Sequence, residues 1–208
     1  MANQRDIITQ TLENMNRIYK DVGQIAQIVE EGMRYRDFKA IGDAAITWEV
    51  STAYNNPSSW LYRWFARVFT KDDSPQKAVG YCIHLGNYAP QYEEKLQQLG
   101  VFFPFANVSL LEGFEKAVNE LRRPDLYNCL WGAGWFERVQ QVSEHLVGGR
   151  VELGTVSANA VTYFVDLLAL NSRAAITELL KEPMVAMFNG KSNYVSEKNL
   201  PVIRLKQA

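Results

Sequence analysis

The feature that most constrains this chain is an apolar seam in its first 33 residues. Apolar side chains recur there in alternating steps of four and three, at Ile8, Leu12, Met15, Tyr19, Val22, Ala26, Val29 and Met33. Such spacing places all of them on one face of an α-helix. Residues 4–33 therefore predict a single helix about 45 Å long, at roughly 1.5 Å per residue.

A lone helix cannot bury such a seam, so the seam must pack against something else. We favour packing across the rest of the same chain, with pairing to another chain as the alternative. The positions beside the seam carry little charge to select a partner, since they hold Thr11, Asn16, Gly23 and Gly32. If the seam binds a protein partner or a second copy, the expected interface residues are Leu12, Tyr19, Val22 and Val29.

Residues 44–86 contain three runs in which side chains alternate between two faces. The runs lie at 46–51, 60–69 and 79–86, and the turn-rich segments NNPSS and KDDSPQ separate them. Alternation of aromatic and β-branched residues predicts an antiparallel β-meander.

A helical interpretation of the same region stays open. Asn56-Pro57, Ser74-Pro75 and Ala89-Pro90 each resemble the start of a helix with proline in its first turn. The run AVGYCIHLG favours strands, because its two glycines and its β-branched residues make a poor helix.

The remaining elements are predicted from residues that start or stop helices and from the periodicity of apolar side chains. Pro90 opens a short helix that Gly100 closes, and Ser109 with Glu112 has the spacing of a capping box at a helix start. The other predictions are strands at 101–108 and 150–156, helices at 110–123, 135–146 and 171–183, and a strand or a buried helix at 160–170. The last helix is expected to begin at Asn171 or Ser172 and to stop at Pro183.

These elements predict a single α+β domain over residues 1–208. It would contain a long N-terminal helix, an antiparallel β-meander and a helix-rich C-terminal half, and an all-α helical array is the alternative. The polar tail 190–208 is expected to be an extended arm, or an edge strand from Pro201 to Leu205.

Composition excludes several classes of partner. The formal net charge is −1, so no basic excess drives binding to nucleic acid. The opening MANQRDIITQ lacks the features of a signal peptide, and no run of about 18 apolar residues could span a membrane. Cys82 and Cys129 show no short-range pairing. We therefore expect a cytoplasmic protein with no nucleic acid or membrane partner.

Two nine-residue stretches resemble each other. WLYRWFARV at 60–68 and WGAGWFERV at 131–139 agree at five positions, but no wider duplication surrounds them. We interpret the match as convergence of core-forming residues rather than as two copies of one binding element.

The meander also suggests a ligand site. On three neighbouring strands, one face would carry Arg63, Arg67, His84 and Glu49, while Tyr81 and Ile83 would lie on the other. An arginine pair with an imidazole and a carboxylate could bind a small anion. An ordinary solvated sheet face with cross-strand ion pairs is the simpler interpretation.

Motifs for catalysis, metal or cofactor binding are absent from the sequence. Cys82 and His84 alone cannot complete a metal site, and no nucleophile elbow or glycine-rich phosphate loop occurs. We name no catalytic residue, metal or cofactor. The leading hypothesis is a non-enzymatic interaction or accessory protein that acts through an aromatic-rich surface or the N-terminal helix. A small-anion-binding regulatory domain and an enzyme with an unrecognised site are the alternatives.

Overall fold

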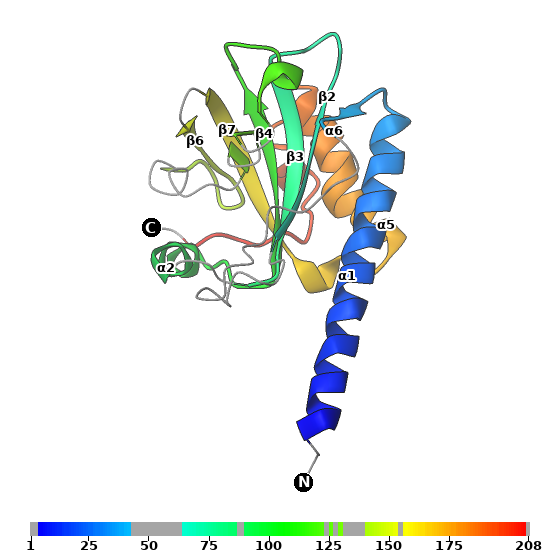
Figure 1. The fold of residues 1–208 in the computed structure, drawn as a ribbon. Coiled ribbons are helices and arrows are strands. Elements are labelled where there is room, and N and C mark those ends of the chain that lie inside the picture. Colours follow the sequence, from blue (N-terminus) through cyan, green and yellow to red (C-terminus); the bar gives the residue numbers. More distant parts are fainter. Residues whose placement is uncertain are drawn as a thin grey trace.

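The computed structural model describes residues 4–42, 64–86, 90–122, 125–126, 129–130, 140–153 and 156–206. In this part of the chain an N-terminal helix precedes a seven-stranded antiparallel sheet, and short helices follow the last strand. The prediction of an α+β fold is confirmed, and the all-α alternative is wrong. Figure 1 shows the sheet with the long helix α1 beside it.

The sheet joins the middle and the C-terminal half of the chain. Its strand order is β1-β2-β3-β4-β7-β6-β5, and all neighbours are antiparallel. The strands are β1 (Lys39–Ala40), β2 (Trp64–Thr70), β3 (Lys77–His84), β4 (Phe105–Glu112), β5 (Gln140–Gln141), β6 (Val147–Leu153) and β7 (Val156–Asp166).

Helices lie at both ends of the sequence and after the central strands. They are α1 (Gln4–Arg34), α2 (Pro90–Gln98), α5 (Arg173–Ile176), α6 (Glu182–Phe188) and α7 (Tyr194–Glu197). The 3₁₀ turns η2 (Val118–Glu120) and η3 (Leu167–Ala169) and the π-helical turn η4 (Thr177–Lys181) complete the described elements.

The sheet is buried on both faces, because successive side chains of each strand enter two different cores. Phe65, Phe69 and Ile83 pack with the second half of α1 and with α6. Cys82 and Phe105 point the other way and pack with Leu96 of α2 and with Leu126 and Leu130. This two-sided burial explains why β3 is apolar along nearly its whole length.

Several local predictions agree with the structure. Residues 4–33 form one helix, and α2 starts at Pro90 and is followed by Gly100 at φ +81°. The run whose type was left open, 160–170, is the strand β7 as far as Asp166. Ser172 caps α5 by accepting a hydrogen bond from the Ala175 amide.

The predicted helix after Ser109 is wrong. Ser109 and Glu112 both lie in β4, where the Ser109 hydroxyl bonds the Thr162 hydroxyl of β7 at 2.6 Å. The capping-box spacing therefore arose within a buried strand. Pairing with both β3 and β7 outweighed the local signal.

The predicted helix at 135–146 is also wrong over its described residues, 140–146. Gln140 and Gln141 form β5, and Gly148, just beyond the predicted helix, lies in β6. A Cβ on Gly148 would lie 2.9 Å from a methyl carbon of Val142 and 3.2 Å from the Ala160 carbonyl oxygen. The glycine is needed for close packing in the sheet rather than for ending a helix.

Pro183 does not end the C-terminal helix as predicted. The helix continues through α6 to Phe188, and the π-helical turn η4 directly precedes α6. Proline has no backbone N–H to donate, and the wider π turn accommodates that loss at the start of α6.

As far as Lys206, the C-terminal tail packs against the body instead of forming an extended arm. Tyr194–Glu197 form α7, and Leu200 and Leu205 are buried. The backbone amides of Ile203 and Leu205 donate to the carbonyls of Phe164 and Glu144 at 2.9 and 2.7 Å.

Candidate functional site

The seam of α1 is covered along only half of its length. Val22 and Val29 are 2% and 0% exposed, whereas Ile8 and Leu12 are 58% and 56% exposed. Figure 1 shows the N-terminal half of α1 extending beyond the rest of the molecule. The same sequence pattern is thus core in one half of the helix and surface in the other.

The covered half is fixed to the body by packing and by charge. Tyr19 contacts Phe65 of β2 edge to face, with ring centroids 5.8 Å apart, and Met33 is fully buried. Glu30 accepts from Arg67 of β2 and Glu31 accepts from Arg173 of α5, each at 2.6 Å. These contacts hold α1 in one orientation on the sheet.

The exposed half presents four large aliphatic side chains, which we call the α1 stripe: Ile7, Ile8, Leu12 and Ile18. The opposite face carries both signs of charge, with Glu13 and Arg17 among its residues. The sequence prediction named Leu12 but missed Ile7 and Ile18. They stand eleven residues apart, about three helical turns, so they share a line directly beside the seam.

A groove of about 600 Å³ lies where α1 meets the segment that follows β7. We call it the α1 groove. Its apolar walls include Ile25 and Ile28 of α1, Leu85 after β3, and Leu167 and Leu170 after β7. Ile18 belongs both to the stripe and to the groove wall, so the two surfaces are continuous.

The groove has a polar rim and an exposed apolar edge. Asp21 and Gln24 come from α1, and Asn171 and Arg173 come from the start of α5. Leu168 also lines the groove and is 74% exposed. An apolar hollow with a few polar groups at its rim suits an apolar side chain from another molecule.

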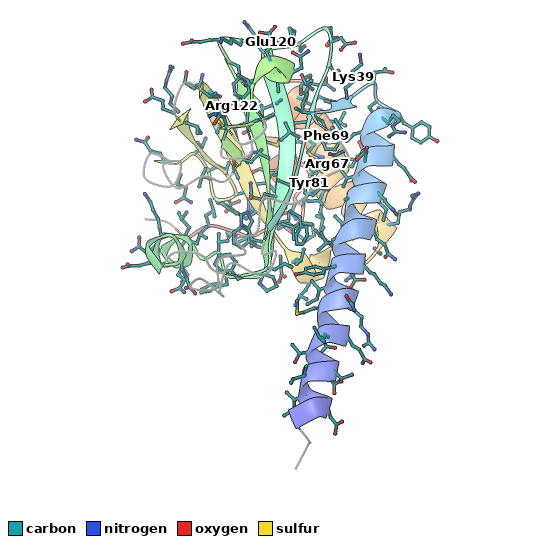
Figure 2. The ribbon with its side chains drawn as sticks, viewed as in Figure 1. Lys39, Arg67, Phe69, Tyr81, Glu120 and Arg122 are labelled. Carbon is teal, nitrogen blue, oxygen red and sulfur yellow. The ribbon has the colours of Figure 1, made fainter. Side chains whose placement is uncertain are left out.

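A second hollow, of about 380 Å³, surrounds Arg67. The Arg67 guanidinium is 2% exposed, and its Nη2 donates to Glu30 Oε2 at 2.6 Å. Arg34 reaches the other oxygen of Glu30 at 3.4 Å, and Lys39 is paired with Asp72. Figure 2 shows Arg67 and Phe69 between the sheet and α1. The pairing with Glu30 offsets the cost of burying the guanidinium charge.

His84 lies on the other face of the sheet, so the predicted shared patch is wrong. In the β2–β3 register Arg67 stands opposite Tyr81, and His84 stands opposite Trp64. Residues directly opposite each other share a face. Arg67 therefore joins Tyr81 and Ile83, whereas the prediction placed Arg67 with His84. Glu49 and Arg63 lie outside the described residues.

His84 is buried in a hydrogen-bonded polar network. Its Nε2 lies 2.7 Å from Asn107 Oδ1, and Asn107 Nδ2 donates to the Leu130 carbonyl and to Ser109 Oγ, each at 3.1 Å. Because the Leu130 carbonyl can only accept, the amide presents its oxygen to His84, and Nε2 carries the proton. Burial lowers the pKa of His84 to about 3, although the Asn107 bond opposes this shift. The ring is neutral at physiological pH and does not face solvent.

Among the residues that the structure describes, the cysteines and acidic groups offer no alternative centre. Within the described segments, no group of three His, Cys, Asp or Glu residues could hold a metal ion. Cys82 and Cys129 are both buried, and burial raises the pKa of both thiols, that of Cys129 to about 12. Both therefore remain protonated, which makes them poor nucleophiles.

Most aromatic side chains placed by the structure belong to the core rather than to a surface. Phe65, Phe69, Tyr81, Phe105, Tyr163 and Phe164 are all at most 5% exposed. The nine-residue repeat cannot be compared, because 131–139 and 60–63 lie outside the described residues. Of the two surfaces suggested by the sequence, the N-terminal helix is the better candidate.

Comparison with known protein families, curated proteins and solved structures gives no match for this chain. No helix in the described ranges is both long and apolar enough to cross a membrane.

Proposed function

We propose that this chain is a non-enzymatic interaction or accessory protein whose exposed half of α1 binds an amphipathic helix. One observation carries the proposal: a single seam is buried from Val22 onward but remains open to water at Ile8 and Leu12. A short helix that projects into water is marginally stable by itself, so packing against a second helix would stabilise it.

The free energy expected from burying the apolar side chains of the α1 stripe suits reversible binding. Burying an isoleucine or leucine fully is worth about 1.5–3 kcal/mol. The side chains of the α1 stripe are roughly half exposed, so each could contribute on the order of 1 kcal/mol. Ordering and loss of free motion oppose this gain, so the helix contact alone supports a weak complex rather than a permanent one.

The chemistry of the body supports a role in binding rather than catalysis. His84, Ser109 and Thr162 are buried and bonded to neighbours inside the sheet. Arg67 is paired with Glu30. These polar groups contribute to the integrity of the body.

Site-specific photo-crosslinking in living cells tests the proposal. A photoreactive phenylalanine analogue at Leu12 should give an adduct of one discrete mass. The same analogue at Glu13, on the opposite face of the same exposed helix, should not. Equal labelling from both positions, or no adduct from Leu12, would exclude the α1 stripe as a binding surface.

A small-anion site is the second candidate, carried by the hollow around Arg67. Glu30 pairs with Arg67 and Arg34, and Asp72 pairs with Lys39, so three cations meet two carboxylates at this hollow. A phosphate or carboxylate could bind at the exposed head groups of Arg34 and Lys39. Titration with inorganic phosphate at low salt should stabilise the wild-type chain against heat. Arg34→Gln together with Lys39→Gln should remove that effect, and Arg150→Gln, on β6, should retain it.

A further inference from the structure

We propose that the α1 stripe inserts into a hydrophobic groove between two neighbouring helices of a partner protein, rather than packing against one helix alone. This inference rests on the proposed function, whose amphipathic helix becomes one of the two walls of that groove. Its basis is the angular width of the stripe, together with the way in which the body buries the same face of α1 further along the helix.

The stripe is wider than the contact face of a simple helix pair. At about 100° per residue, Ile18 lies about 20° around the helix axis from Ile7, and Leu12 lies about 140° from it. Within residues 7–19, the side chains in this arc are uncharged: Ile7, Ile8, Thr11, Leu12, Met15, Ile18 and Tyr19. Two helices that pair alone share a narrow seam, whereas an apolar arc wider than about 100° is typical of a helix that packs into a larger core.

The covered half of α1 shows how such an arc is buried. Ile25 repeats the angular position of Ile7, and Glu30 repeats that of Leu12, since about 18 residues make five full turns. Glu30 pairs with Arg67 of β2, whereas Ile25 lines the α1 groove together with residues of α5. One edge of the arc therefore contacts the sheet, and the other contacts the segment that contains α5 and η4. In the body, two separate elements bury this face.

Two helices of a partner would supply the same two-sided burial to the exposed half. In helix-in-groove complexes, the inserted helix is anchored by apolar side chains three and four residues apart. The exposed half has this spacing at Ile8, Leu12, Met15 and Tyr19. One helix lying over the middle of the arc would leave Ile7 and Leu12, at its two edges, partly in water. Two helices would cover both edges and so hide more of a small apolar surface.

The charges of the exposed half favour a protein groove over a lipid surface. Glu13, Arg17 and Lys20 lie on the side of the helix opposite the arc and would stay in water. They carry both signs of charge, whereas a helix that lies on an anionic membrane has a predominantly basic polar face. Asn14 and Asn16 border the arc on its two sides, so hydrogen bonds rather than ion pairs would form at the rim of the partner groove.

Photo-crosslinking from the two edges of the arc tests the inference. The photoreactive phenylalanine analogue is placed at Ile7 in one sample and at Leu12 in another, in the full-length chain in living cells. Mass spectrometry then identifies the linked peptides. Both positions should give an adduct of the same mass, with linked peptides from two helices of one protein that are separated by a loop. Glu13, on the opposite side, is the control position and should give no adduct.

Three results would overturn the two-helix groove. Linked peptides from one uninterrupted stretch, no longer than the exposed half of α1, indicate a single helix. Adducts of different mass from Ile7 and Leu12 indicate two unrelated contacts. Adducts of twice 23.7 kDa from both positions indicate a second copy of this chain.

Substitutions at the two edges give the second readout. With the analogue at Met15, near the middle of the arc, Ile7→Gln and Leu12→Gln should each lower the adduct yield about fivefold, as expected for a half-exposed aliphatic side chain. The chain is expressed at a level low enough for the yield to follow affinity. Glutamine has a high helix propensity, and Glu13→Gln, as the matched control, should leave the yield unchanged. A loss from only one edge contradicts burial of both.

The two proposals can fail separately. If Leu12 gives an adduct of one discrete mass and all linked peptides come from one helix, the two-helix groove is excluded while the binding role of the α1 stripe stands. If Leu12 gives no adduct in cells, the proposed function fails, and the groove fails with it.

Discussion

The two halves of α1 carry the same pattern and have different surroundings. Residues 22–33 lie against the sheet, and Val29 is inaccessible to solvent. The N-terminal half of α1 projects beyond the body, and the side chains of the α1 stripe are 43–58% exposed. The periodicity identifies which face of a helix will be buried. It does not identify what will bury that face, which depends on where the body ends.

The largest expected difference between the halves is in stability. Val29→Glu would place a carboxylate in the core without a partner and should lower the free energy of unfolding by about 4 kcal/mol or more. Leu12→Glu, at an exposed position of the same seam, should change it by less than about 0.5 kcal/mol in the monomer. Urea denaturation of both variants at low protein concentration measures the contrast, and similar losses would contradict it.

Acid should weaken the body through its buried histidine, His84. The pKa of His84 is lowered to about 3 by burial, against about 6.5 in the unfolded chain. Below pH 6.5 the unfolded state therefore binds a proton that the folded state does not, and stability falls as pH decreases. The loss from this group approaches about 1.4 kcal/mol per pH unit well below pH 6.5 and amounts to about 2 kcal/mol between pH 6.5 and 4.5.

Urea denaturation at several pH values should show this slope in the wild-type chain and a shallower one in His84→Gln. Only the slopes are compared, because the substitution also alters packing. Parallel slopes in the two proteins would mean that His84 is not the titrating group.

Adjacent glutamates in the covered half should differ in their effect on stability. Glu30 pairs with Arg67, which is 2% exposed, whereas Glu31 pairs with Arg173, which is 67% exposed. Glu30→Gln should cost about 2 kcal/mol, because it replaces a charged partner of a buried guanidinium by a neutral one and Glu30 itself is partly solvated. Glu31→Gln should cost no more than about 0.5 kcal/mol. Denaturant titration of both variants, at low and high salt, measures the difference. An equal cost would show that burial of Arg67 does not strengthen its ion pair.

The smallest expected effect lies at the junction of the two halves. A Cβ on Gly23 would meet nothing within 4 Å, so Gly23→Ala should stabilise α1 by about 0.5–1 kcal/mol. A Cβ on Gly32 would collide with the Lys181 side chain, so Gly32→Ala should gain less. Thermal unfolding compares the two variants. A destabilised Gly23→Ala would indicate that the junction needs glycine for a reason other than space.

The sequence was informative where one pattern had one structural solution. The seam of α1, the glycine after α2 and the Ser172 cap all depend on short-range geometry. Ser109 and Glu112 failed because the same spacing fits a strand whose partners lie about 30 and 50 residues away along the chain. Short-range sequence patterns do not reveal a hydrogen bond between distant residues, such as that between Ser109 and Thr162.

The candidate site depends on the strand register and on the path of the chain after β7, and neither can be read from the sequence. Whether Arg67 and His84 share a face depends on the β2–β3 register, and a shift of one residue reverses the answer. The groove depends on how the segment after β7 returns to α1. Leu12 could be named from the seam, whereas its exposure could be seen only once the edge of the body was known.

Because α1 is continuous from Gln4 to Arg34, the number of residues between its two halves fixes the direction in which the stripe faces relative to the body. Each residue turns the helix by about 100° and advances it by about 1.5 Å. One residue inserted between the two halves would swing the stripe about a quarter of a turn away from the groove side. Seven would return it to within about 20° while moving it roughly 10 Å outward. Insertions between the two halves would therefore rotate the exposed face about the helix axis and move it along that axis in discrete steps. The body would remain unaltered.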